Sequence, residues 1–519
     1  MRNELKISLF IPIINLILFA GCTPKAGTDQ MIYCVPLLVG EVSQTSAIFQ
    51  SRLAESDSLV YENIHDAASI AKTDLKGVEG IAFFEVSQSP SFTESTRSSW
   101  MNAEKQNDYI IKEKMDSLQP GTKYYYRLHY GTKRENLFVS PVHSFKTLPS
   151  IDIPSAIEFV MITGSNLDGF YLGAGFGKPT TEGAEAYKGE DKYSGFPGLK
   201  TIAEMKPDFF IGNGDNVYYD LPPDRKARTQ QELRAKWHRA FGMHNMMRLF
   251  SQVPTYWLKD DHDHRFNDSD TLRVNEKHGD LPSHELGVKT FIEQVPVIDR
   301  AATDTRTYRS YQVGSLLQIW FLEGRDYRTA NKTPDGPAKT IWGDEQKRWL
   351  KQTLLESRAM FKLLISPTPM VGPDDAKKRD NHVNASGFRY EGESFFAWLK
   401  ENNFLAKNFY ILCGDRHWQY HSIHPSGFEE FSSGAIVDQN ARLGRIPGDS
   451  LSSDPDALIR QPFSQKEASG GFLKVIIRQG ADKVTGEIEF VFYDENGVEL
   501  YRTLKGSANE NKSLVTTGQ

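Results

Sequence analysis

One stretch of this sequence joins a buried strand to a turn that carries ligand groups: Phe209-Phe210-Ile211-Gly212-Asn213-Gly214-Asp215-Asn216-Val217-Tyr218-Tyr219-Asp220. Its first three residues are apolar, and the glycines that follow end the strand. An apolar strand that ends in Gly-Asp brings a carboxylate to the edge of an α/β sheet, where ligands bind. The stretch therefore predicts a strand at 209–211 and a functional turn at Asp215.

Apolar strands alternate with amphipathic helices from Ser155 onward, which is the pattern of an α/β domain. The predicted strands are 157–163, 209–211, 254–258, 317–322, 361–365 and 409–413. Helices are predicted at 344–358 and 394–402, and a short helix is predicted to end at 205. Antiparallel strands are predicted at 471–477, 487–493 and 499–504. The stretches 165–195, 367–392 and 438–470 lack periodicity, and structureless loops of this length are functional or disordered.

Residues 31–150 have the turn signals and alternation of a β module. Pro120-Gly121 marks a turn before the Tyr-rich strand at 122–128, and this pattern resembles that of fibronectin type III-like sandwiches. No catalytic chemistry is visible in this N-terminal β-sandwich domain. It is expected to pack against, or to space, the α/β domain at 151–507, which a polar tail at 508–519 follows.

The N-terminus has the features of an export signal. Arg2 and Lys6 precede an almost wholly apolar run at 7–20, which is too short for a comfortable membrane span. The run ends in Leu18-Phe19-Ala20-Gly21-Cys22, which resembles a bacterial lipobox. The pattern predicts a signal peptide at 1–22, lipid on Cys22, and a tether at 23–30, hence an exported, membrane-anchored lipoprotein in the periplasm or at the cell surface. The alternative is an ordinary signal peptide or short anchor with a chance cysteine.

Composition limits the class of protein. A chain of 519 residues is long enough for two or more domains. The 61 Lys and Arg against 67 Asp and Glu give a net charge of −6, so a basic surface for nucleic acid is not expected. The 3 cysteines are an odd, sparse set, which argues against a disulfide framework.

Polar clusters follow several of the predicted strands. They are Gly164-Ser165-Asn166-Leu167-Asp168, Gly214-Asp215-Asn216-Val217-Tyr218, Lys259-Asp260-Asp261-His262-Asp263-His264-Arg265 and Gly414-Asp415-Arg416-His417. One Asp-Asp-His-Asp segment alone is compatible with a solvated turn. Buried carboxylates that meet no cation are costly, so four such clusters in one α/β domain indicate a metal site. They offer too many ligands for one ion, which favours two metals.

These clusters resemble, in order and content, the motifs of the metallophosphoesterase superfamily, and most closely its alkaline phosphatase D (PhoD-like) branch. The segment Glu323-Gly324-Arg325-Asp326-Tyr327-Arg328 is similar to that branch's Asp-x-Arg-x-Tyr-Arg segment. The resemblance covers most of the chain after the predicted tether. It implies a metallophosphoesterase αββα sandwich preceded by the fibronectin type III-like sandwich.

The resemblance also implies roles for individual residues. Asp215 would bridge two metals, with Tyr218 and His417 on the first metal and Asp261 and Asp415 on the second. His262 would protonate the leaving group or steady the phosphate, and Asp263 would orient it. The reaction implied is hydrolysis of phosphomonoesters or phosphodiesters by a hydroxide held between the metals. Arg265, Arg325 and Arg328 could hold phosphate oxygens or be structural salt-bridge partners, and Arg325 is taken as the catalytic one.

The ligand types indicate which metals suit each position. The second set is all oxygen and suits Ca²⁺, Mg²⁺ or Mn²⁺, whereas a phenolate and an imidazole suit a transition metal, for which the resemblance implies Fe(III). The sequence departs from the family at Asn166, where the family has a cysteine. The neutral amide is a harder ligand than a thiolate, so Mn²⁺, Zn²⁺ or Ca²⁺ could replace iron there. Asp168 is the alternative ligand at this position.

Further candidates come from the aperiodic loops and from other polar segments. Asp374, Asp375, Asp380, Asn381 and His382 could shape the pocket or bind another cation, and His421 is favoured over His424 to face the site. Arg225, Lys226, Arg228 and Arg234 form either a basic rim or a solvated helix face, and Tyr219 and Cys413 are expected to be packing residues. Two other functions stay open: a non-catalytic surface lipoprotein with a degenerate metal site, and hydrolysis of sulfate or phosphonate esters.

Overall fold

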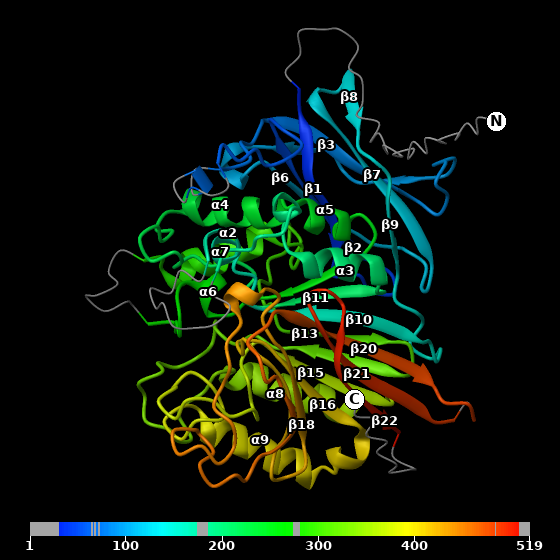
Figure 1. The fold of residues 1–519 in the computed structure, drawn as a ribbon. Coiled ribbons are helices and arrows are strands. Elements are labelled where there is room, and N and C mark those ends of the chain that lie inside the picture. The colour runs from blue at the N-terminus through cyan, green and yellow to red at the C-terminus, as the bar shows by residue number, and fades with distance from the viewer. Residues whose placement is uncertain are drawn as a thin grey trace, which may run out of the picture. The chain divides into compact units, whose positions relative to one another are not determined.

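The computed structural model describes residues 31–63, 66, 69–70, 73–173, 185–272, 281–482 and 484–507. The predicted signal peptide with Cys22, the tether at 23–30 and the polar tail at 508–519 lie outside the described residues. A compact unit begins at Ile32 (Figure 1).

The larger of two central sheets has nine strands in the order β22-β21-β20-β10-β11-β12-β1-β2-β6. They are β1 Tyr33–Gly40, β2 Ala47–Ala54, β6 Ile110–Met115, β10 Ile157–Ile162, β11 Phe209–Asn213, β12 Thr255–Leu258, β20 Gly471–Gln479, β21 Gly486–Asp494 and β22 Glu499–Gly506. β10, β11 and β12 run parallel, with Ile211 opposite Met161 on one side and Tyr256 on the other. β20, β21 and β22 are antiparallel, as the sequence predicts.

The second sheet has seven strands in the order β13-β14-β15-β16-β18-β17-β19. They are β13 Arg309–Val313, β14 Leu317–Phe321, β15 Phe361–Ser366, β16 Phe409–Cys413, β17 Gln419–Ile423, β18 Glu429–Ser433 and β19 Arg460–Ser464. Apolar side chains of both sheets, among them Phe159, Ile211, Ile365 and Leu412, form one buried core between them. The two sheets therefore pack face to face.

Helices cover the outer face of each sheet (Figure 1). α2 Leu167–Leu172, α3 Pro197–Met205, α4 Gln230–Phe241, α5 His244–Phe250 and α7 His284–Gln294 contribute to a core on the larger sheet, and α8 Gly343–Glu356 and α9 Arg389–Glu401 to one on the smaller. This arrangement confirms the predicted αββα sandwich. No helix in the described part of the chain is long and apolar enough to cross a membrane.

All three aperiodic stretches contain regular structure that periodicity did not reveal: α2 lies in 165–195, the start of α9 in 367–392, and β19 in 438–470. α2 is only 6 residues long, less than two turns, and is held by its Asn166 cap, so it has no repeat to detect. α9 begins at Arg389, five residues before the predicted start at 394. Its first turn buries Glu391, which accepts a hydrogen bond of 2.7 Å from the Ile341 amide. The contact between Glu391 and the Ile341 amide therefore extends α9 beyond the region that the apolar pattern of the sequence predicts.

The N-terminal module is a two-layer sandwich. β1, β2 and β6 face a smaller sheet built from β3 Gly80–Ser87, β4 Thr96–Arg97, β5 Met101–Ala103, β7 Lys123–Lys133, β8 Asn136–Val139 and β9 His143–Lys146. Phe49, Phe84, Tyr126 and Phe145 are buried between the layers. β1 also pairs in parallel with β12 through Gly40 and Thr255, so one sheet of the sandwich continues the large central sheet.

A buried ion pair fastens the sandwich to the second sheet. Glu41, directly after β1, accepts a hydrogen bond of 2.5 Å from Arg309 Nε and one of 2.8 Å from the Tyr311 hydroxyl. Arg309 also donates to the Trp257 carbonyl of β12 at 3.1 Å. The side chains of Arg309 and Glu41 are 14% and 4% exposed. Removing one partner therefore leaves the other charge buried and unpaired.

We expect Glu41→Gln to lower the free energy of unfolding by about 3 kcal/mol, because Arg309 keeps its buried charge without a counter-ion. Urea unfolding near neutral pH measures this change. The matched control is Asp116→Asn, which removes the surface pair with Lys114, whose side chains are 64% and 43% exposed. The control is expected to change stability by less than about 1 kcal/mol. Equal losses in the two variants would contradict the role given to Glu41.

Candidate metal centre

Strands of both sheets end in turns that need left-handed backbone. Gly164 after β10, Gly214 and Asp215 after β11, and Asp415 after β16 have φ angles of 66°, 77°, 53° and 60°. Aspartate is among the non-glycine residues that tolerate this region. A side chain at Gly214 would lie 2.6 Å from Asp260 Cβ, so the turn also needs glycine for close packing. The turns bring polar groups of both sheets to one edge.

The predicted ligands of the first metal lie together. Tyr218 donates its hydroxyl hydrogen to Asp215 Oδ2 at 3.1 Å, and His417 Nε2 lies 3.4 Å from the same oxygen. The Tyr218 hydroxyl and His417 Nε2 are 3.3 Å apart. Burial lowers the pKa of His417 well below its usual value, so its imidazole is neutral, the form that binds metals.

The predicted ligands of the second metal lie beside the first set. Ligand atoms of Asp215, Asp261 and His262 are within 4.8 Å of one another, and so are those of Asp260, Asp261 and Asp415. The structure thus gathers every predicted aspartate ligand, although these residues come from three different strand ends. A third group of the same kind joins Asp261 to two loop residues, Asp268 and Asp380.

The negative charge of this cluster exceeds what the neighbouring cations compensate. Asp215 Oδ1, Asp260 Oδ2 and Asp380 Oδ2 are buried and meet no hydrogen-bond partner among the described residues. Burial raises the pKa of Asp215 well above its usual range, with further contributions from Asp261 and Asp260. Burial also raises the pKa of Asp260 to about 8, although Arg325 opposes this. Oxygen ligands with uncompensated charge fit bound cations, so the residues present suit a metal centre.

His262 is held by a different carboxylate from the one predicted. His262 Nδ1 lies 2.7 Å from Asp220 Oδ1, and its ring lies 4.3 Å from that of Tyr218. Burial lowers the pKa of His262, but Asp220, Asp261 and Asp215 outweigh burial and raise it well above its usual value. The prediction that Asp263 orients His262 is wrong. Asp263 instead completes the capping box of the short helix α6 Asp261–His264, because it accepts a hydrogen bond from the backbone amide of the N-cap residue Asp260. It also accepts one from the backbone amide of Asn216.

Arg325 has a structural position behind the acidic cluster, which corrects its predicted contact with phosphate. The side chain is 0% exposed; Nε donates to Asp260 Oδ1 at 2.5 Å and Nη1 to the Ser269 carbonyl at 2.9 Å. Its Nη2 lies 3.9 Å from both Asp261 Oδ1 and Asp380 Oδ2. Arg325 therefore offsets part of the charge of the aspartates and is shielded from solvent.

The other two arginine candidates also bond to the protein. Arg265 donates to the carbonyls of Pro282, Asp270 and Leu272. Arg328 donates to the Gly324 carbonyl and to Asn331 Oδ1. Both hold loops, as the structural alternative predicts.

Asn166 is linked to the predicted ligand Tyr218 through the side chain of Asn440. Its Oδ1 accepts a hydrogen bond of 2.9 Å from the Gly169 amide, which makes it the N-cap of α2. Its Nδ2 lies 3.4 Å from Asn440 Oδ1, and Asn440 Nδ2 donates to the Tyr218 hydroxyl at 2.6 Å. Metal binding by Asn166 stays a prediction. Asp168 is not the alternative ligand, because it forms ion pairs with Lys236 at 2.6 Å and Arg239 at 3.4 Å.

Several further candidates have structural partners. Asp374 forms ion pairs with Arg416 and Arg442, and Arg234 forms one with Glu293. Asn381 Oδ1 accepts hydrogen bonds from the Val383 and Asn384 amides. His382 Nε2 lies near Glu391, and His424 bonds to Ser426. The prediction that His421 faces the site is wrong: it bonds to Glu429 at 2.6 Å and to Tyr501 at 3.0 Å. Arg225, Lys226 and Arg228 precede α4, which begins at Gln230. Tyr219 and Cys413 are buried packing residues, as expected.

Sequence reasoning missed three contributors, which are Asp220, Asp268 and Asn440. Asp220 stands within the opening stretch, but nothing in its spacing distinguishes it from Asp263 as the partner of His262. Asp268 lies just after the Asp-Asp-His-Asp segment, in a turn without periodicity. Asn440 comes from the aperiodic stretch 438–470, and its contact with Tyr218 spans 222 residues of sequence.

Comparisons with known proteins agree in both parts of the chain. A family model described as PhoD-like phosphatase matches residues 184–455, and one described as PhoD-like phosphatase, N-terminal domain, matches residues 26–149. Alkaline phosphatase D of Bacillus subtilis (strain 168) is 22% identical over 392 residues, 67% of this chain. The match spans 60% of the length of that relative.

Two solved structures share the fold. A structure of PhoD, 17% identical, matches 93% of this chain and 92% of its own with a TM-score of 0.67. A purple acid phosphatase from yellow lupin (Lupinus luteus) seeds, 11% identical, matches 91% of this chain and 74% of its own with a TM-score of 0.54.

We expect Asp215→Asn to raise the free energy of unfolding of the metal-free protein by about 1–3 kcal/mol, because it removes a buried charge and keeps the shape. The same variant is expected to lose most of the stabilisation that added Mn²⁺ or Ca²⁺ gives the wild type. Thermal and urea unfolding with a chelator, and then with each metal, measure both effects. Asp168→Asn is the control: it leaves Lys236 and Arg239 without their counter-ion and should destabilise with or without metal. Loss of stability in chelator for both variants would argue against a cation site at Asp215.

Proposed function

Since the chain belongs to the PhoD-like phosphatase family, we propose that it is an exported phosphoesterase that uses two bound metal ions to hydrolyse phosphomonoesters or phosphodiesters. One observation carries this proposal. Buried oxygens of Asp215 and Asp260, without hydrogen-bond partners among the described residues, lie beside Asp261, Asp415, Tyr218 and His417 at one sheet edge.

The proposed ligands divide by chemistry. Asp215 would be shared, because each oxygen of a carboxylate can serve one ion. Tyr218 and His417, with Asn166 beside them, would hold a transition metal such as Fe(III), and Asp261 and Asp415 would hold Ca²⁺, Mg²⁺ or Mn²⁺. When bound, such cations offset the charge of a phosphate ester and make water a stronger nucleophile near neutral pH.

His262 is proposed as the proton donor. The carboxylates around it favour the protonated ring, and Asp220 holds Nδ1, which directs Nε2 away from that carboxylate. As the bond between phosphorus and the leaving oxygen breaks, Nε2 would give its proton to that oxygen, and the new phosphorus–oxygen bond would form from water. Asp220 acts through His262 and is a positioning residue.

Export and lipid anchoring are part of the proposal and rest on the N-terminal sequence. The basic start, the apolar run at 7–20 and the lipobox-like Leu18–Cys22 segment support them. A lipid on Cys22 would hold the phosphoesterase at a membrane surface, facing substrates outside the cytoplasm.

We expect the protein reconstituted with Fe, Mn, Zn or Ca to hydrolyse aryl phosphate monoesters or diesters, and His262→Ala to lower kcat by about 10²–10⁴-fold. Asp220→Asn is expected to lower kcat more than it changes KM. It should also move the alkaline limb of the kcat profile to lower pH, because the carboxylate that raises the pKa of His262 is lost. Initial rates across pH measure all three effects.

The matched control for these rates is His424→Gln, a histidine that stacks on Phe396 away from the centre and should leave the rates unchanged. Aryl sulfate and phosphonate esters are tested in parallel. The proposal fails if no metal supports hydrolysis of a phosphate ester, or if His262→Ala matches the wild type with every metal.

The lipid anchor has its own test. Expressed with its full N-terminus in a bacterium, the wild type is expected to incorporate labelled fatty acid and to sediment with membranes, whereas Cys22→Ser should do neither. Cys34→Ser, which changes a cysteine of β1, is the control and should behave as the wild type. Label on the Cys22→Ser protein would exclude this anchor.

A further inference from the structure

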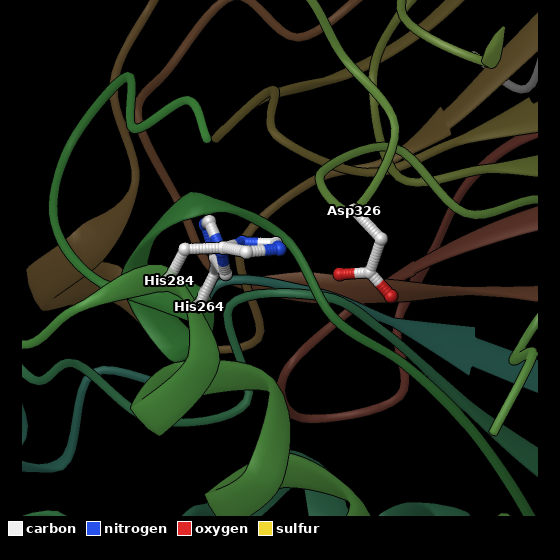
Figure 2. A group of neighbouring side chains, drawn as sticks. All are labelled: His264, His284 and Asp326. Atoms are coloured by element: carbon white, nitrogen blue, oxygen red, sulfur yellow. The ribbon is translucent and has the colours of Figure 1, made fainter. Parts of the chain in front are cut away.

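A second group of metal-ligating side chains lies outside the acidic centre. His264 is the last residue of α6, His284 is the first residue of α7, and Asp326 lies in the loop after β14. One ligand atom from each lies within 4.8 Å of the other two. Figure 2 shows the two imidazole rings side by side, with a carboxylate oxygen of Asp326 facing them. None of the three is among the residues proposed to hold the two catalytic metals.

The two imidazoles are spaced as ligands of one ion. His264 Nε2 and His284 Nδ1 are 2.9 Å apart, and the rings meet at 73°. With metal–nitrogen bonds of about 2.0–2.1 Å, two neighbouring ligands of one tetrahedral ion lie about 3.3 Å apart. The present spacing therefore needs little movement of either ring. His264 is buried and His284 partly exposed, so an ion can reach the pair from solvent.

The tautomer of His264 is set by the groups behind it. Ser269 Oγ lies 2.9 Å from His264 Nδ1, and the Ser269 hydroxyl donates to the Asp261 carbonyl at 3.3 Å. Because that hydroxyl hydrogen is engaged, Ser269 accepts the hydrogen on Nδ1, which leaves the lone pair on Nε2. Metal-binding histidines in proteins are held in this way by the other ring nitrogen. Burial lowers the pKa of both histidines, so both rings are neutral.

The carboxylate of Asp326 is only partly compensated. Its Oδ1 lies 2.8 Å from Lys259 Nζ, but the same ammonium also bonds to Glu323. Glu323 has further donors, which are the Thr307 hydroxyl and the Arg325 amide. Burial and Glu323 raise the pKa of Asp326 to about 6. Two carboxylates thus share one buried ammonium, and a carboxylate oxygen of Asp326, whose side chain is 10% exposed, faces the imidazoles (Figure 2).

We propose that His264, His284 and Asp326 bind a zinc ion at a site separate from the acidic centre. Two imidazoles and one carboxylate are ligands that Zn²⁺ prefers, and three protein ligands leave a fourth tetrahedral position for water. The all-oxygen group of Asp260, Asp261 and Asp415 suits harder cations, so the two places select different ions. Zinc here would tie the end of α6, which carries Asp261 and His262, to α7 and to the loop after β14.

The test is zinc content after chelation, incubation with Zn²⁺ alone and gel filtration, measured by elemental analysis. To silence the acidic centre, the full-length protein carries Asp215→Asn and Asp415→Asn. In this background we expect one zinc per chain, with imidazole nitrogens in its X-ray absorption spectrum. His284→Gln should remove this equivalent, and Ser269→Ala should weaken binding about 10–100-fold.

The matched control is His244→Gln, because His244, like His284, is the first residue of a helix. It should keep the full zinc content. If His284→Gln unfolds, Asp326→Asn gives the same test from another element. Equal zinc in His284→Gln and His244→Gln, or a spectrum without imidazole, would overturn the site. This outcome is independent of phosphatase activity, so it separates failure of the zinc site from failure of the proposed function.

Discussion

The structure depends on a cluster of like charges buried at one edge of its sheets. Asp215, Asp260, Asp261 and Asp415 meet there, and the cations built into the protein, such as Arg325 and Arg416, offset only part of their charge. Burial of uncompensated carboxylates opposes folding, and the raised pKa values of Asp215 and Asp260 express that cost. A protein that keeps such a cluster gains from it only when cations bind. The fold supports a centre that is completed by metal.

β12 connects this cluster to the rest of the molecule. On one side it pairs with β11, whose end carries Asp215, and on the other with β1 of the N-terminal sandwich. The carbonyl of Trp257 in β12 is held by Arg309, which pairs with Glu41 directly after β1. The sandwich thus extends the sheet that carries the centre and braces the strand before Asp260. This continuity gives the N-terminal module a mechanical role although it contributes none of the proposed ligands.

The four residues of α6 face four different environments. Asp261 lies in the acidic cluster, His262 bonds to Asp220, Asp263 accepts from the amide of the N-cap residue Asp260, and His264 lies against Ser269 and His284. So short a helix has little stability of its own. Its position therefore comes from these side-chain contacts, so the ions proposed on either side of α6 would affect the placement of His262.

The sequence by itself indicated most strands of the α/β domain and the types of ligand, and the resemblance of its motifs to a known family implied the layers. Apolar runs mark buried strands and Gly-Asp turns mark their ends, and the resemblance implied that Asp215, Asp261, Asp415 and His417 meet at one site. Only the tertiary structure decided which polar groups pair. His262 bonds to Asp220 rather than to Asp263, and Asp168 forms an ion pair with Lys236. Asn440 donates a hydrogen bond to the Tyr218 hydroxyl. The reason is physical: strand patterns arise from neighbours in sequence, whereas the partner of a buried charge is set by contacts between segments as far apart as Tyr218 and Asn440.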